Sequence, residues 1–76
     1  MIEIRIPQAS MEMIEGEIDE WVVEDGATVT EGEIIYQLAT DKVVVDIEAP
    51  AAGVLRQIGK EGVVYPVGEV IGHIEQ

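Results

Sequence analysis

The alternation of apolar and polar residues at the amino terminus predicts a β-strand. Residues Ile2–Ile6 place isoleucine at every second position, with Glu3 and Arg5 between them. A period of two puts the isoleucines on one face of a strand and the charged residues on the other. Pro7 ends this strand because it has no backbone N–H for a ladder hydrogen bond. The segment Gln8–Glu15 then lacks either periodicity and is expected to form a loop.

Seven more short apolar segments follow, separated by glycine, proline and acidic residues. No window shows a sustained period of 3.6 residues, so no helix is expected. Short strands with turn signals every 8–12 residues are typical of a β-sandwich or barrel. Trp21, on the second strand, is expected to be buried in the core. The predicted strands cover residues 16–23, 29, 34–39, 43–47, 54–58, 63–64 and 70–74.

The second half of the chain repeats the first. Four residues recur at a distance of 36 positions, and Gly16 recurs as Gly53 at a distance of 37. Two matching halves predict two similar sheets related by a pseudo-twofold axis. Chance recurrence of Gly-Glu pairs is the weaker explanation, because the glycines fall at predicted turns. The matched pairs are Gly26 and Gly62, Gly32 and Gly68, Glu33 and Glu69, and Ile35 and Ile71.

The two halves meet at Thr40-Asp41-Lys42-Val43, between two predicted strands. A two-residue hairpin usually contains Asn-Gly or Asp-Gly, because a type I′ turn needs positive φ at both positions. Asp41-Lys42 contains no glycine, so a type I turn is expected. Departures from local preference are frequent at functional sites. The sequence therefore predicts that Lys42 lies at the tip of a hairpin.

An exposed Lys42 is suited to modification by another enzyme. Asp41, Asp46 and Glu48 surround it in the sequence and favour the protonated amine. A catalytic lysine would need apolar or cationic surroundings instead. Before any family is considered, a modified lysine and an ordinary surface lysine are equally consistent with these residues.

Composition excludes several classes of function. The 76 residues are expected to form one domain, with 47% hydrophobic residues and a net charge of −12. Nucleic-acid binding needs clustered basic residues, and anionic membranes repel such a charge. The acidic excess favours a solvated, monomeric domain, or alternatively steering toward a basic patch on a partner. No transmembrane segment or signal peptide is visible.

Catalytic and metal-binding patterns are absent from the sequence. It contains no Cys and one His, so a disulfide scaffold and a cysteine zinc site are excluded. The lack of Cys fits a reducing compartment. His73 has no nucleophile placed beside it in the sequence, and the acidic residues are scattered over turns. The glycine spacings match no phosphate-binding loop.

Several motifs together resemble the lipoyl domains of the dihydrolipoyl acyltransferases in 2-oxoacid dehydrogenase complexes. Asp41-Lys42 stands at the midpoint of the glycine pattern, and the likeness extends over nearly the whole chain. The motifs are residues 7–21, Glu24-Asp25-Gly26, Glu31-Gly32-Glu33, Thr40-Asp41-Lys42-Val43, Ala49-Pro50 with Gly53, and the pair Gly62 and Gly68.

The resemblance implies a flattened barrel, or barrel-sandwich hybrid, of two four-stranded antiparallel sheets. It also implies lipoic acid attached to Lys42, flanked by Asp41 and Val43, on a carrier without an active site of its own. The arm would exchange acyl groups and electrons with a thiamin-diphosphate-dependent 2-oxoacid decarboxylase and dihydrolipoyl dehydrogenase. A lipoate ligase or lipoyl transferase would attach it, in the cytoplasm or the mitochondrial matrix. The implied partner-recognition loop comprises Gln8, Ala9, Ser10, Met11 and Glu12.

Two other functions remain as alternatives. Biotin-carrying domains share the fold but usually place the lysine between two methionines, whereas here its neighbours are Asp41 and Val43. An unmodified β-sandwich interaction module is the second alternative. The chain departs from the lipoyl pattern at Ala39, where relatives often have Glu, at Val43, where they often have Ala, and at Gln8-Ala9, where Leu-Gly is common.

Overall fold

The structure, a computed structural model, describes residues 1–8, 11–40 and 43–76. Its described part consists of strands and their connections, which confirms the expected all-β fold. Each predicted strand is present, and no end is shifted by more than two residues. The strands are β1 (Ile2–Arg5), β2 (Glu15–Trp21), β3 (Thr28–Val29), β4 (Ile34–Ala39), β5 (Val44–Glu48), β6 (Gly53–Gln57), β7 (Val64–Pro66) and β8 (Val70–Glu75).

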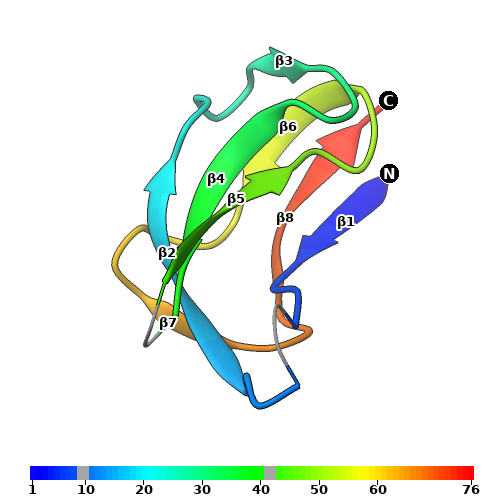
Figure 1. The fold of residues 1–76 in the computed structure, drawn as a ribbon. Helices are drawn as coiled ribbons and strands as arrows, with labels where there is room; N and C mark the ends of the chain where they lie inside the picture. Colours follow the sequence, from blue (N-terminus) through cyan, green and yellow to red (C-terminus); the bar gives the residue numbers. More distant parts are fainter. Residues whose placement is uncertain (9–10, 41–42) are drawn as a thin grey trace.

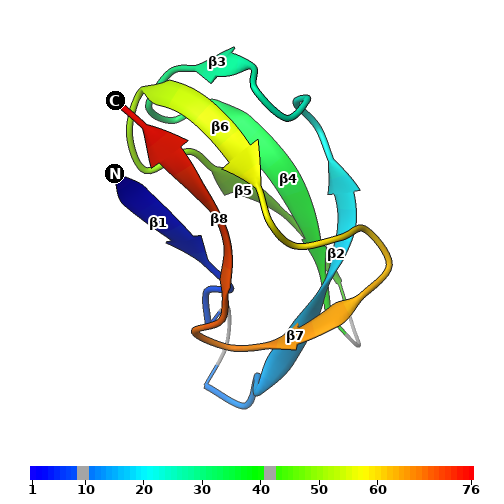
Figure 2. The same ribbon diagram turned by 180° about the vertical axis from the view of Figure 1, so that it is seen from behind.

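The strands form two four-stranded antiparallel sheets that face each other across one core (Figures 1 and 2). The first sheet has the order β1-β8-β6-β3, and the second has the order β5-β4-β2-β7. Both sheets are strongly curved (Figures 1 and 2), and they do not join into a closed barrel. Two facing four-stranded antiparallel sheets of this shape confirm the expected flattened barrel-sandwich fold. The two chain termini lie side by side at one end of the molecule, because β1 pairs with β8.

The predicted pseudo-twofold relation is visible in the pairing. The relation pairs each strand of the first half of the chain with the strand four positions later: β1 with β5, β2 with β6, β3 with β7 and β4 with β8. Exchanging these partners converts the order of the first sheet into that of the second. Turn hydrogen bonds obey the same relation. The N–H of Gly26 donates to the carbonyl of Leu55 at 2.7 Å, and the N–H of Gly62 donates to that of Ile18 at 2.8 Å. The internal sequence repeat is therefore a structural repeat.

The core is almost entirely aliphatic, and no charged residue is buried in the described part. Alternating residues of both sheets point into it, as a half-buried antiparallel sheet requires. Twelve residues make up this cluster: Ile4, Ile6, Met13, Ile18, Val29, Ile35, Tyr36, Leu38, Ala49, Leu55, Ile71 and Ile74.

The expectation that Trp21 is a buried core residue is wrong, because its side chain is only partly buried and packs against the edge of the core. Its ring centroid lies 5.2 Å from that of Tyr36. The indole N–H donates to the carbonyl of Gly59 at 3.1 Å. An indole needs such an acceptor, and Gly59 supplies it near the end of β2, where solvent still reaches the ring.

Tyr36 holds the one buried side-chain oxygen without a hydrogen-bond partner among the residues that the structure describes. Burial raises the pKa of its phenol from 10.0 to about 12. An unpaired buried hydroxyl is unfavourable, so Tyr36→Phe is expected to raise the free energy of unfolding by about 1 kcal/mol. Urea denaturation at pH 7 measures this. Tyr65→Phe serves as the control and is expected to lower stability, because the Tyr65 hydroxyl accepts a hydrogen bond from the N–H of Lys60.

The pH dependence of Tyr36 has a defined sign. Between pH 10 and pH 12 the phenol ionises in the unfolded chain but not in the folded one, so stability is present below pH 10 and lost as pH rises. The loss amounts to about 2 kcal/mol by pH 12. The advantage of Tyr36→Phe over the wild type should therefore grow across this range. A constant difference between the two proteins would contradict the burial of the hydroxyl.

Candidate functional site

The end of the β4–β5 pair is closed by hydrogen bonds between Thr40 and Val43. The N–H of Thr40 donates to the carbonyl of Val43 at 2.8 Å. The N–H of Val43 donates to the Thr40 hydroxyl at 3.1 Å, and that hydroxyl donates to the carbonyl of Val43 at 3.0 Å. The chain joins these two residues through Asp41 and Lys42, which lie outside the described residues. The expected turn type and the position of the Lys42 side chain therefore stay predictions.

The strands leading to this end combine a buried anchor with exposed flanks. Leu38 is fully buried and pairs with Val45, whereas Ala39 pairs with Val44. Val43 and Val44 are 57% and 56% exposed. Core packing thus fixes the direction in which the strand pair ends, while solvent reaches Val43 and Val44.

The predicted partner-recognition loop is organised by the Gln8 side chain. Its amide group donates to the carbonyls of Met11 and Met13, each at 3.3 Å. Met13 is buried, whereas Met11 is 96% exposed and Glu12 is exposed as well. Ala9 and Ser10 lie outside the described residues. The described loop residues Gln8, Met11 and Glu12 are therefore exposed, and the buried Met13 that follows them forms the base of the loop.

Gly16 packs the base of this loop against strand β4. A Cβ atom at position 16 would lie 2.7 Å from Cδ1 of Leu38 and 2.8 Å from Cε of Met13. Both side chains occupy the space that the missing Cβ leaves. Because Leu38 stands two residues before Thr40, the loop and the Thr40–Val43 end are supported by the same part of the core.

The described residues contain no cluster of three or more His, Cys, Asp or Glu side chains suited to a metal ion. His73 lies on β8 between Glu3 of β1 and Arg56 of β6. In the described part of the chain, no helix is long and apolar enough to cross a membrane. The candidate functional site is therefore the end of the β4–β5 pair, where Lys42 is predicted to lie next to the exposed residues Val43 and Val44.

The chain resembles known proteins over nearly its whole length. The model of the family described as "Biotin-requiring enzyme" matches residues 2–74. The chain is 39% identical over its full length to the dihydrolipoyllysine-residue succinyltransferase component of the 2-oxoglutarate dehydrogenase complex of Bacillus subtilis, of which it covers 18%. It is 36% identical, over 96% of its length, to the acetyltransferase component of the pyruvate dehydrogenase complex of Staphylococcus aureus, of which it covers 17%.

A solved structure agrees with these relatives. The fold matches the lipoyl domain of the 2-oxoglutarate dehydrogenase complex from Azotobacter vinelandii with a TM-score of 0.82 and 30% sequence identity. The match covers all of this chain and 98% of that domain. The chain thus spans less than a fifth of the length of the two acyltransferase relatives, and nearly the whole of a single lipoyl domain.

Proposed function

Because the chain belongs to the family of biotin- and lipoyl-attachment domains, we propose that residues 1–76 form a lipoate carrier modified on Lys42. The hydrogen-bonded pair Thr40–Val43 carries this proposal. It ends two well-anchored strands and leaves two residues to join them, one of which is a lysine. Attachment to Lys42 would form one amide bond between Nζ and the carboxyl carbon of an activated lipoyl group, while that carbon loses its bond to the activating group and Nζ loses a proton. An attaching enzyme must supply the activated acyl group.

The residues around the attachment point fit a covalent arm. Val43 and Val44 beside it are both more than half exposed. An arm attached here would extend into solvent and reach other proteins. The bound lipoyl group supplies a disulfide that accepts an acyl group and two electrons, and later releases both. The chain itself supplies only presentation, since tethering raises the concentration of the arm at each active site.

We also propose the partner enzymes of this chain from its relatives. The relatives named above are components of 2-oxoglutarate and pyruvate dehydrogenase complexes. The expected partners are a thiamin-diphosphate-dependent 2-oxoacid decarboxylase, dihydrolipoyl dehydrogenase, and a lipoate ligase or lipoyl transferase. A cytoplasmic location follows for a bacterial host. Acyl transfer to coenzyme A would belong to an acyltransferase of which this chain is a part or a partner.

The experiment that tests this function uses two ligases. The chain is produced once with a lipoate ligase and lipoic acid, and once with a biotin ligase and biotin. Intact-mass spectrometry is expected to show one lipoyl group per chain in the first case and no biotin in the second. The lipoylated chain should then be reductively acylated by a 2-oxoacid decarboxylase. A biotin adduct alone would favour a carboxylase carrier, and an unchanged mass in both cases would favour an interaction module.

A further inference from the structure

One row of side chains crosses the second sheet immediately before the Thr40–Val43 end. Register places Val44 opposite Ala39, Ala39 opposite Glu17, and Glu17 opposite Val64. Directly opposed residues of antiparallel strands project from the same face. Leu38 and Ile18 in the adjacent row are fully buried, so this row faces outward.

Glu17 is the one charged residue of this row. It is half-buried, and among the described residues it forms neither an ion pair nor a side-chain hydrogen bond. Val64 beside it is 49% exposed, and Val44, which lies beyond Ala39 at the other end of the row, is 56% exposed. A half-buried carboxylate in a row of otherwise apolar side chains is suited to contact with a cation whose surroundings are apolar, the arrangement that concentrates binding energy in protein interfaces.

The two symmetry-related sheets differ sharply in charge. The strands of the second sheet contain six acidic residues and no basic residue: Glu15, Glu17, Asp19, Glu20, Asp46 and Glu48. The pseudo-twofold relation between the two sheets therefore does not extend to their charge. The second sheet is electrostatically complementary to a basic protein surface.

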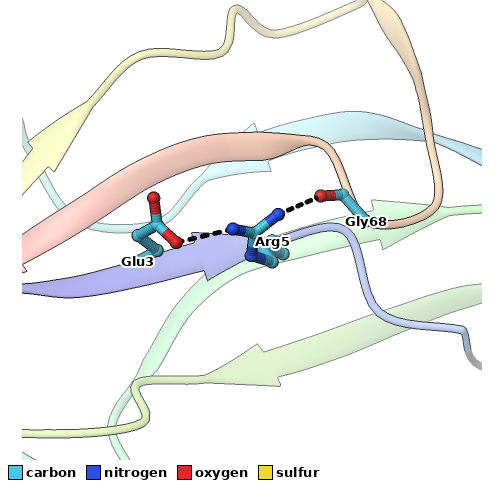
Figure 3. A network of polar contacts seen from close by, with 3 residues as sticks. All are labelled: Glu3, Arg5 and Gly68. Atoms are coloured by element: carbon cyan, nitrogen blue, oxygen red, sulfur yellow. Dashed lines mark hydrogen bonds and ion pairs between the residues drawn. The ribbon is translucent and has the colours of Figure 1, made fainter.

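The first sheet balances its charges internally. Arg5 binds Glu3 at 2.6 Å and donates to the carbonyl of Gly68 at 2.8 Å (Figure 3). Arg56 binds Glu75 at 2.7 Å. The hydrogen bond from Arg56 holds the pKa of the Glu75 carboxyl below its ordinary value. The first sheet is therefore not complementary to a basic partner.

We propose that the row Val44–Ala39–Glu17–Val64 is the contact surface for the enzyme that attaches the lipoyl group, which places a basic side chain on Glu17. This inference rests on the proposed function. The attaching enzyme must bring Nζ of Lys42 itself to its active site, so its surface must reach the strands beside the hairpin. Enzymes that act on the far end of the arm can remain an arm's length away. An activated acyl nucleotide is anionic, which requires a basic site near that contact.

The test measures lipoylation of the unmodified chain by a purified lipoate ligase with ATP, Mg²⁺ and lipoic acid. Glu17→Gln keeps the size of the side chain and removes its charge, and kcat/KM is expected to fall about tenfold. Glu48→Gln is the matched control, because it removes one charge from the same sheet at a position four residues, about 13 Å, along β5 from Val44 of the row. It is expected to stay within about twofold of the wild type.

A rescue variant separates contact from folding. Since the side chains at positions 17 and 39 are direct neighbours, Glu17→Gln combined with Ala39→Glu returns a carboxylate to the row and should recover most of the lost rate. Val64→Thr, of nearly the same shape, tests the apolar part and is expected to lower the rate about threefold. Melting temperatures of all variants verify that each is folded.

The outcomes distinguish the two proposals. A wild-type chain that is not modified at all overturns the proposed function. A wild-type chain that is modified, with Glu17→Gln as fast as the wild type, overturns the contact row and leaves the function standing. Equal losses for Glu17→Gln and Glu48→Gln would also overturn the contact row, because they would reduce the effect to overall charge.

Discussion

Lys42→Arg is expected to abolish the lipoyl adduct completely while leaving the melting temperature within a few degrees of the wild type. Arginine keeps the positive charge and nearly the length of lysine, but its guanidinium does not form the amide bond that attachment requires. Intact-mass spectrometry after production with a lipoate ligase measures the result. Loss of the adduct also removes acyl transfer, so reductive acylation by a 2-oxoacid decarboxylase should become undetectable.

The chain offers a close control for this variant. Its only other lysine is Lys60, which is exposed in the connection between β6 and β7. Lys60→Arg should carry the same single adduct as the wild type. An adduct that survives in Lys42→Arg and disappears in Lys60→Arg would move the attachment point to the other half of the molecule. A large loss of stability in Lys42→Arg would contradict its expected place at an exposed turn.

Gly53→Ala is expected to have the largest effect on stability. Gly53 has a φ of +155°, and a Cβ atom there would collide with the backbone carbonyl of Glu75 and approach Cγ2 of Ile74 to 2.5 Å. A backbone carbonyl paired in a sheet cannot move aside as a side chain can. The free energy of unfolding should fall by about 3 kcal/mol or more. For a domain of this size the melting temperature should then fall by about 15 °C.

Gly62→Ala separates the collision from the conformational cost. Gly62 has a φ of +80°, and no atom lies within 4 Å of the position that its Cβ would take. The variant therefore bears only the strain of a left-handed conformation, about 1 kcal/mol. Calorimetric melting of the two variants should place Gly62→Ala well above Gly53→Ala. Similar melting temperatures would show that crowding between β6 and β8 is not the main constraint at Gly53.

Much of the fold was predictable because local pattern and tertiary structure agree. The alternation in Ile2–Ile6 appears as β1, and the 36-residue repeat of Gly26 and Gly62 appears as two equivalent turns. Trp21 is the exception, since hydrophobicity alone predicts burial. The hydrogen bond that its indole makes with Gly59 depends on a connection 38 residues away, which no local pattern reveals.

The candidate site was predictable only in part. Resemblance and the midpoint of the repeat pointed to Lys42, and the structure adds the Thr40–Val43 closure on either side of it. The row that includes Glu17 could not be predicted, because register depends on irregularities such as the one between Ile18 and Glu20. A shift of one residue would move Glu17 to the opposite face.

The recognition loop illustrates the same limit. The sequence does not distinguish the burial of Met11 from that of Met13, since both flank Glu12 in an aperiodic segment. In the structure Met13 is buried and Met11 is exposed, a difference that follows from the packing of Met13 beside Gly16. Tertiary packing, not composition, selects which methionine is available to a partner.

The most direct test of lipoate carriage is to find the position of the modification in the chain produced in lipoate-synthesising cells. Proteolysis followed by fragment-ion mass spectrometry resolves the peptides that contain Lys42 and Lys60. The account predicts one lipoyl group, on the fragment that contains Lys42, and an unmodified Lys60. A lipoyl group on any other amine, or an unmodified Lys42 in cells whose other carrier domains are lipoylated, would contradict it.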